Sequence, residues 1–206
     1  YFKRAVELNP EEIEPRLYQS MVFMIQRKFE NVDAVFDEFS TDLPFFKLYQ
    51  AYLYLSLGAE DKNEDYFKKS LLILKDFNKK NGYNYVSNLL EFMANWSLSN
   101  HNKALLNISQ AIANFGKDTF DENETNMVWK MTIFGKSALE INLIDLYLFR
   151  SNIYSILEDN TSSCEDLNNA LSLMKSYEIN EQSKYFAFGE NRTYQYLLET
   201  SQNCTN

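Results

Sequence analysis

The sequence predicts an all-α chain built of antiparallel helical hairpins, and three observations lead to this class. Turn residues are scarce, because only five glycines and three prolines occur in 206 residues. Hydrophobic residues make up 45% of the chain and aromatic residues 16%, which is ample material for a buried core. Apolar residues also recur at helical spacing along the chain. A sandwich or barrel would need turn residues about every eight to twelve positions and is disfavoured.

A ten-residue pattern near the start of the chain recurs and indicates internal repetition. Residues 1–10, YFKRAVELNP, are echoed by residues 66–75, YFKKSLLILK. Both copies have an aromatic pair, two basic residues, a small residue and an aliphatic run. An amphipathic helix with one small contact position has this order, and a small residue allows two helices to cross closely.

These residues resemble the second helix of the tetratricopeptide repeat (TPR) family, which carries an aromatic residue, a small residue and then a proline. Phe2, Ala5 and Pro10 follow this order, and Phe36 and Pro44 continue it about one 34-residue motif later. Later units also match, and small residues recur among the matching positions. The matches are Ala51, Tyr54, Leu57, Gly58, Phe67 and Ser70; Leu98, Ser99, Ala104, Ile108 and Ala111; and, most completely, Tyr147, Ser151, Tyr154, Leu157, Ser163, Leu167 and Ala170.

The resemblance implies an α-solenoid, in which stacked antiparallel hairpins form a right-handed superhelix. We expect a single TPR-like domain over residues 1–206. Its expected units are a partial unit at 1–10, then 11–43, 44–80, 83–116, an irregular helical insertion at 117–142, 143–176 and a capping helix at 181–203.

Residues 117–142 depart from the standard unit. An Asp/Glu-rich opening suits a helix start, and apolar residues follow at roughly helical spacing from Met127 to Leu139. The expected structure is an extra or lengthened helix that is interrupted near Gly135 or Asn142. It is either a degenerate repeat or an insertion with its own function.

The last segment, 181–203, has apolar residues on one side, among them Tyr185, Phe188, Leu197 and Leu198. It is expected to be the helix that covers the last apolar face of the repeat stack.

The acidic balance of the chain limits the classes of partner. With 29 acidic and 20 basic residues the net charge is −9, which repels phosphate backbones, so nucleic acid is not expected as a partner. Apolar runs are short and interrupted by charges, so no membrane-spanning segment is expected and the prediction is a soluble protein. The chain opens on Tyr1 rather than Met, so a targeting signal would have been lost with an earlier segment, and cytoplasm and periplasm both stay open.

The two cysteines and the glycosylation sequons each have two interpretations. The cysteines, Cys164 and Cys204, lack CxxC spacing and are either two ordinary thiols or one bridge that joins the last helix to its neighbour. Asn-x-Ser/Thr sequons are interpreted as chance matches in an Asn-rich sequence, and one of them falls inside a predicted helix. They include Asn95, Asn107, Asn160 and Asn191.

Catalytic and cofactor motifs are not found, so no enzyme activity, cofactor or metal is predicted. The one histidine, His101, lies in a short turn and is expected to be a turn or N-cap residue. No cysteine or carboxylate stands at metal-ligand spacing from it. The sequence has no GxGxxG, GxxxxGK[ST], HExxH or EF-hand pattern.

The TPR resemblance implies a partner-binding groove lined by the first helix of each hairpin. This groove would be apolar and rich in methionine and aromatic residues, and it lacks the Lys and Arg clamp that some family members use on a carboxylate terminus. The alternative is that these residues pack between hairpins or are covered by residues 117–142. The expected partner-binding residues are Leu17, Met21, Met24, Leu48, Tyr52, Leu55, Leu89, Met93 and Trp96, and the corresponding positions of the last unit are Leu148, Asn152 and Ile156.

Three functions are compatible with these observations. The first is a scaffold or adaptor that binds a peptide or helix of another protein in this groove. The second is a sensor or regulatory module of a larger signalling or transcription protein. The third, an enzyme that uses carboxylates and His101, has the least support. Self-association into a homo-oligomer is also compatible with the sequence.

Overall fold

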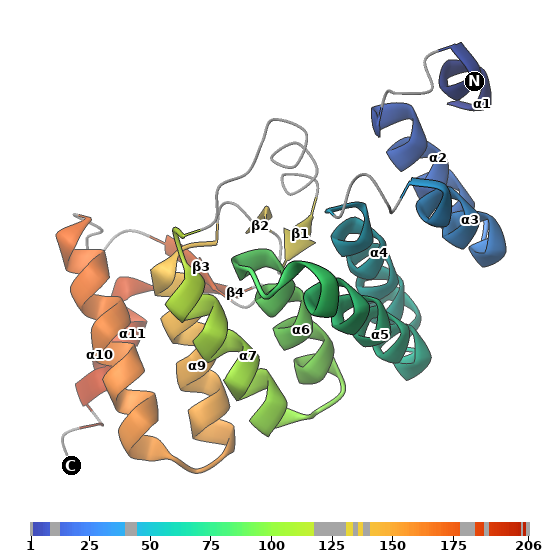
Figure 1. The fold of residues 1–206 in the computed structure, drawn as a ribbon. Helices are drawn as coiled ribbons and strands as arrows, with labels where there is room; N and C mark the ends of the chain where they lie inside the picture. The colour runs from blue at the N-terminus through green and yellow to red at the C-terminus, as the bar shows by residue number, and fades with distance from the viewer. Residues whose placement is uncertain are drawn as a thin grey trace. The chain divides into compact units, whose positions relative to one another are not determined.

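The fold is described from a computed structural model, in which α-helices are the dominant elements (Figure 1). The structure describes residues 2–8, 13–39, 45–117, 131–133, 136–137, 141–177, 184–187, 190–202 and 204. Neighbouring helices pack against each other, which confirms the predicted helical class. The helices are α1 (Phe2–Leu8), α2 (Ile13–Ile25), α3 (Phe29–Phe39), α4 (Phe45–Asp61), α5 (Glu64–Asn81), α6 (Tyr85–Ser97), α7 (His101–Asn114), α9 (Leu143–Ile156), α10 (Asn160–Ser176) and α11 (Tyr194–Gln202).

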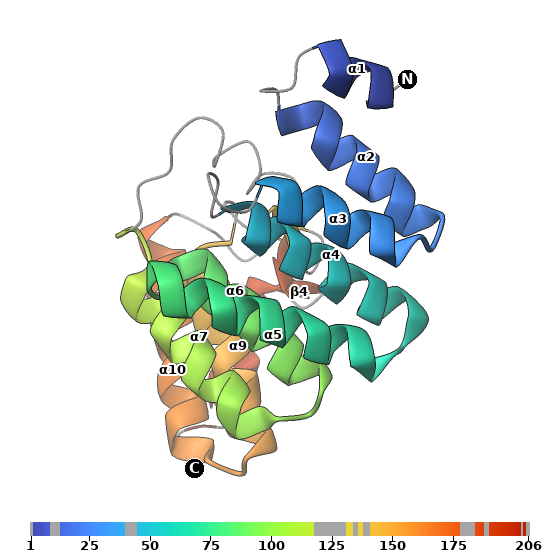
Figure 2. The same ribbon diagram turned by 45° about the vertical axis from the view of Figure 1, so that its right-hand side comes forward.

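The chain forms two compact units, and the first ends at Tyr83. In unit 1, α2 pairs with α3 and α4 pairs with α5, while α3 also contacts α4. Both views show α4 and α5 side by side (Figure 1, Figure 2). The core of the unit contains an aromatic group in which Phe36 of α3 contacts Phe46 and Tyr49 of α4. Burial raises the pKa of Tyr49 above its usual range, and the neighbouring Tyr52 and Tyr18 add to the shift.

The second unit begins at Asn84 and includes α6, α7, α9, α10 and α11. Helices α6 and α7 pair, α9 and α10 pair, and α7 also contacts α9. The ring centroids of Phe92 of α6 and Phe149 of α9 are 5.6 Å apart, so these buried rings connect the α6–α7 and α9–α10 pairs. The expectation of one continuous repeat domain over residues 1–206 stays a prediction.

Four helical hairpins share the same turn: α2–α3, α4–α5, α6–α7 and α9–α10. Each has a non-glycine residue in the left-handed region two positions before its second helix. In each turn the next N–H donates to the carbonyl five residues back, which is the 6→1 bond that ends many helices. The left-handed residues are Arg27, Lys62, Ser99 and Glu158, with φ of 60°, 52°, 56° and 60°. The bonds run from Lys28 to Phe23 (2.9 Å), Asn63 to Gly58 (3.2 Å), Asn100 to Asn95 (2.8 Å) and Asp159 to Tyr154 (2.9 Å).

Polar side chains fix where several helices begin. Asn84 and Ser87 form a capping box at the start of α6, and Asn142 and Asp145 form another at the start of α9. In each box the side chain of the first residue accepts a backbone N–H, and the side chain three residues later accepts in return. Such reciprocal bonds satisfy donors that a helix start leaves unpaired. They therefore define the helix start from short local sequences.

Small residues lie where paired helices cross, as predicted for Ser70, Ser151 and Ser163. The Ser70 hydroxyl of α5 donates to the Ala51 carbonyl of α4 at 2.9 Å. Ser151 and Ser163 make the equivalent contact between α9 and α10. At Gly58 of α4 an added Cβ would lie only 2.7 Å from the ring of Phe67, so a larger residue would force the helices apart.

The prediction of a helical insertion at 117–142 is wrong for residues 132–133 and 136–137, which form two short strands. Strand β1 (Thr132–Ile133) pairs antiparallel with β2 (Lys136–Ser137). Met131 is fully buried, and the carbonyl of Ile141 accepts a hydrogen bond from the Tyr85 hydroxyl of α6 at 3.2 Å. Most of the remaining residues of the predicted insertion, among them Met127, lie outside the described residues.

The expected capping helix at 181–203 is corrected to a short hairpin followed by a shorter helix. Strand β3 (Lys184–Ala187) pairs antiparallel with β4 (Glu190–Thr193), with Ala187 opposite Glu190, and α11 follows directly. Aromatic residues in this segment favour strands as well as helices, which is why an apolar side alone did not distinguish them.

Candidate functional site

The predicted groove residues of unit 1 are mostly buried. In α2 and α4 the first and last residues of each predicted triplet lie in the core, and only the middle residue is half-buried. This corrects the prediction for the four core residues, because a side chain packed inside its own unit offers no surface to a partner. The buried residues are Leu17, Met24, Leu48 and Leu55, and the half-buried ones are Met21 and Tyr52.

In unit 2 more of the predicted surface is accessible. Leu89 of α6 is buried, while Met93 and Trp96 on the same helix are half-buried. In α9 the corresponding order is Leu148, which is buried, Asn152, which is half-buried, and Ile156, which is 45% exposed. Exposure therefore increases toward the C-terminal ends of both helices. We call the set Met93, Trp96, Asn152 and Ile156 the α6–α9 surface.

Trp96 lies at the edge of an aromatic cluster. Its ring centroid is 6.3 Å from Phe92, one turn earlier on α6, and 5.6 Å from His101. His101 is the first residue of α7, after the N-cap Asn100, rather than the N-cap itself. Among the described residues the buried Nδ1 atom of His101 has no hydrogen-bond partner. Trp96 is thus anchored on one side by Phe92 and keeps part of its indole accessible, as an aromatic binding residue requires.

A polar cluster joins three helices of unit 1. The Asp33 carboxylate of α3 accepts hydrogen bonds from Gln50 (2.9 Å) and Tyr54 (2.7 Å) of α4 and from Lys69 (2.6 Å) of α5. Lys69 also donates to the Tyr54 hydroxyl at 2.8 Å. The Tyr54 side chain is fully buried, so its hydroxyl offers no route to a substrate. This cluster orients α3, α4 and α5 against one another.

An ion pair fixes the α9–α10 hairpin. Arg150 of α9 donates through Nε (2.6 Å) and Nη2 (2.7 Å) to the two oxygens of Asp166 in α10, whose side chain is only 2% exposed. Its Nη1 also reaches the Ser109 hydroxyl of α7 at 3.4 Å. The hydrogen bond with Asp166 raises the pKa of Arg150. Sequence analysis missed this pair because an Arg and an Asp sixteen residues apart carry no signal without the hairpin geometry.

Two of the sequon asparagines are buried in unit 2. Asn95 of α6 donates to the side-chain oxygen of Asn107 in α7 at 3.0 Å, and Asn107 donates to the Glu91 carboxylate at 2.7 Å. Both asparagines are buried, so neither can carry a glycan in this fold. Asn160 is exposed at the start of α10, and the side chain of Asn191 lies outside the described part of the chain.

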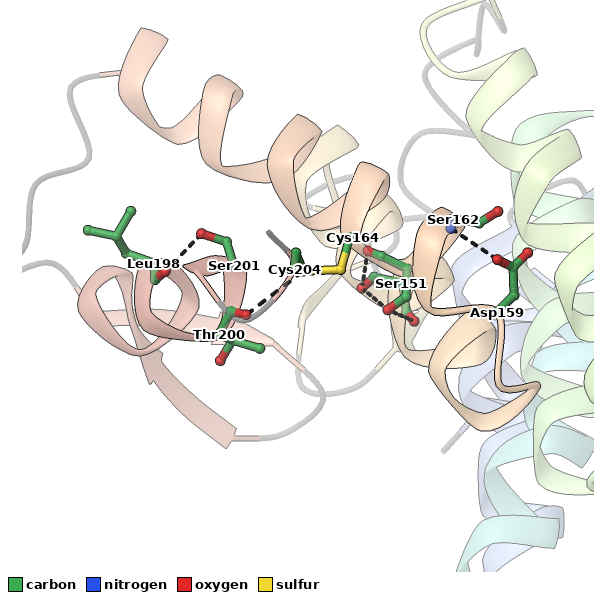
Figure 3. The surroundings of a disulfide bond; sticks show 9 residues. Ser151, Asp159, Ser162, Cys164, Leu198, Thr200, Ser201 and Cys204 are labelled. Carbon is green, nitrogen blue, oxygen red and sulfur yellow. Dashed lines mark hydrogen bonds between the residues drawn. A yellow bond between two sulfur atoms is a disulfide. The ribbon is translucent and has the colours of Figure 1, made fainter. Parts of the chain in front are cut away.

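The two cysteines are joined in a disulfide bond, which decides between the two interpretations of the sequence (Figure 3). Cys164 lies in the second turn of α10, and Cys204 follows α11 forty residues later. The bridge therefore connects the last helix to its neighbour. Sequence could not predict the pairing, since a hairpin and a helix of unknown path separate the two residues.

Within the described ranges no group of three or more His, Cys, Asp or Glu side chains is placed to hold a metal ion. None of the described helices is both long and apolar enough to cross a bilayer.

Comparison with models of protein families, with curated proteins and with solved structures found no match for this chain.

Proposed function

We propose that this chain is a TPR-like repeat protein that works as a scaffold or adaptor by binding an apolar peptide or helix of another protein. In this proposal its hairpins stack as an α-solenoid with a right-handed superhelix. The observation that carries the proposal is the repeated turn of the four hairpins, each with a left-handed residue and the same 6→1 hydrogen bond. A unit of structure that recurs in this way is the basis of repeat proteins, which present extended binding surfaces.

The half-buried positions of the first helices support the same function. Met21, Tyr52, Met93 and Asn152 occupy equivalent predicted positions on four helices, and all four are half-buried. Side chains at the edge of a core keep a fixed position while part of their surface stays open to a partner. A recurring position of this kind is how a repeat protein builds one surface from several units.

The α6–α9 surface of unit 2 has the chemistry of a binding site. Trp96 supplies a large rigid aromatic group, and tryptophan is enriched among residues that dominate binding energy. Met93 supplies a flexible, polarisable thioether that adapts to different apolar partners. Ile156 adds an exposed aliphatic side chain from α9. An amphipathic helix or extended peptide with two or three apolar side chains fits such a surface.

A peptide selection tests this function. Peptides of about twelve residues are selected from a random display library on the whole chain, and the dissociation constant of the enriched sequence is measured by fluorescence anisotropy. The double variant Met93→Asp/Trp96→Asp is expected to weaken binding by about tenfold or more, because each change removes apolar contact and adds a charge that the peptide cannot pair.

A matched control separates this surface from exposed apolar residues in general. Leu106 of α7 is 58% exposed and belongs to the second helix of its hairpin. Leu106→Asp is therefore expected to leave peptide affinity within about twofold of the unchanged chain. Peptides that bind the double variant as well as the unchanged chain, or that lose affinity equally with Leu106→Asp, would contradict the proposal.

A further inference from the structure

The last helix of unit 2 covers an apolar cluster on the α9–α10 hairpin. Leu197 of α11 is only 1% exposed and packs with Ile144 and Leu148 of α9. The same cluster includes residues of α10, and Leu198 and Cys204 pack against it while keeping part of their surface exposed. The α10 members are Leu167, Ala170, Leu171 and Met174.

The cover over this cluster is short. Helix α11 has nine residues, and such a short helix is not stable in water without tertiary contacts. Among its described side chains, Leu197 and Ser201 are buried and Leu198 is half-buried. A short helix that depends on tertiary contacts opens at a lower free energy than the core around it.

The disulfide joins the chain just after α11 to helix α10. Cys204 comes two residues after α11 ends, and Cys164 lies near the start of α10 (Figure 3). The bridge closes a loop between residues forty positions apart, so β3, β4 and α11 are held at both ends. Without the bridge, no covalent link other than the main chain would join this segment to α10.

We propose that the Cys164–Cys204 disulfide is a redox-controlled latch, which keeps α11 closed over the α9–α10 hairpin and opens when a dithiol reduces it. In the opening step the S–S bond breaks, and the dithiol supplies two electrons and two protons. It becomes a disulfide while Cys164 and Cys204 become thiols. A disulfide-bearing oxidant reverses the step and closes the cover.

Two observations support control by solvent-borne thiols. Neither Cys164 nor Cys204 is buried, so a reductant can approach the bridge. The surface under α11 is apolar, and opening therefore changes what the molecule presents to its surroundings. The closed form belongs to oxidising conditions, and the open form to compartments where dithiols keep cysteines reduced.

Hydrogen exchange measured by mass spectrometry tests the latch on the whole chain. Exchange is compared for the oxidised protein, for the same protein reduced with dithiothreitol, and for the reduced protein after reoxidation. Reduction is expected to accelerate exchange in α11 by about tenfold or more, while α6 and α7 change by less than about twofold. Reoxidation is expected to restore the slow exchange. Binding of an apolar fluorescent dye is expected to rise on reduction.

The double variant Cys164→Ser/Cys204→Ser provides a second measurement, because it cannot close the bridge. It is expected to exchange like the reduced protein in α11 and to be insensitive to dithiothreitol. Unchanged exchange in α11 after reduction would overturn the proposal, since packing alone would then hold the cover. Equal acceleration throughout unit 2 would also overturn it, because the bridge would then stabilise the whole unit rather than control one segment.

Discussion

Ser151 and Ser163 hydrogen-bond to each other's backbone across the α9–α10 crossing. The Ser151 hydroxyl donates to the Ser163 carbonyl at 2.9 Å, and the Ser163 hydroxyl donates to the Ser151 carbonyl at 2.8 Å. Hydroxyls reach the opposite backbone only where two helices approach closely. This contact therefore shows that α9 and α10 approach closely at the crossing. A larger side chain at either serine would disrupt it.

Ser163→Leu is expected to destabilise the protein by about 1–3 kcal/mol, because the added carbons must fit a crossing that is already filled. Urea unfolding of the whole chain measures the change. Ser155→Leu on the exposed side of α9 is the control and is expected to change stability by less than about 0.5 kcal/mol. A neutral Ser163→Leu would show that the crossing has room for a larger residue.

Gly58→Ala tests the α4–α5 crossing through the sign of its effect. Alanine in place of glycine inside an exposed helix normally stabilises it by about 1 kcal/mol. Here the new Cβ would lie 2.7 Å from the buried ring of Phe67, so a loss of about 1–3 kcal/mol is expected instead. Thermal and urea unfolding both measure it, and Phe67→Leu in the same chain is expected to recover part of the loss. Stabilisation by Gly58→Ala alone would refute the close approach.

The buried Asn95–Asn107 pair is expected to behave as a unit. Asn107→Leu should cost about 1–3 kcal/mol, because it leaves the Asn95 amide and the Glu91 carboxylate without the partner they have now. The double variant Asn95→Leu/Asn107→Leu should cost less than the sum of the two single changes. A double-mutant cycle of urea unfolding free energies gives the coupling, and strict additivity would contradict the pairing.

Asp159, the N-cap residue of α10, is expected to make the free energy of unfolding depend on pH. Hydrogen bonds from the Ser162 side chain and backbone lower the pKa of Asp159 below its ordinary value of 3.8. Because the folded-state pKa is the lower one, this contribution is present above pH 3.8 and is lost as the pH falls through the lowered pKa. Asp159→Ala should therefore be less stable than the unchanged chain near neutral pH, and the difference should shrink in acid. Asp159→Asn keeps the N-cap without the charge, and its difference from Asp159→Ala should not vary with pH.

The sequence predicted the helical class and the small residues at the crossings. Ser70, Ser151 and Ser163 were recognisable because a small residue at a fixed offset from apolar neighbours has one main use in a helical hairpin. The shared turn was not predicted, since Arg27 and Lys62 are unusual residues for a left-handed position and carry no local signal.

Only some of the predicted binding residues are accessible. Helical periodicity indicates which residues share a face, but it does not indicate how much of that face a neighbouring helix covers. Leu17, Leu48 and Leu89 therefore looked like groove residues and are core residues. Met93 and Trp96 keep part of their surface accessible, and periodicity does not distinguish them from these core residues.

The end of the chain was the least predictable part. An apolar side over residues 181–203 fits a helix or a hairpin equally well. Whether Cys164 and Cys204 pair depends on the path of the same segment. Both outcomes follow from tertiary structure rather than from local pattern.

The emission of Trp96 tests the binding function most directly. The chain has two tryptophans, and Trp129 lies outside the described residues, so Trp129→Phe leaves Trp96 as the one indole reporter. When the selected peptide is added to this variant, the Trp96 emission is expected to shift to shorter wavelength with the same dissociation constant that anisotropy gives, because the peptide removes water from the indole. Peptide binding that leaves the Trp96 emission unchanged would contradict a partner site on the α6–α9 surface.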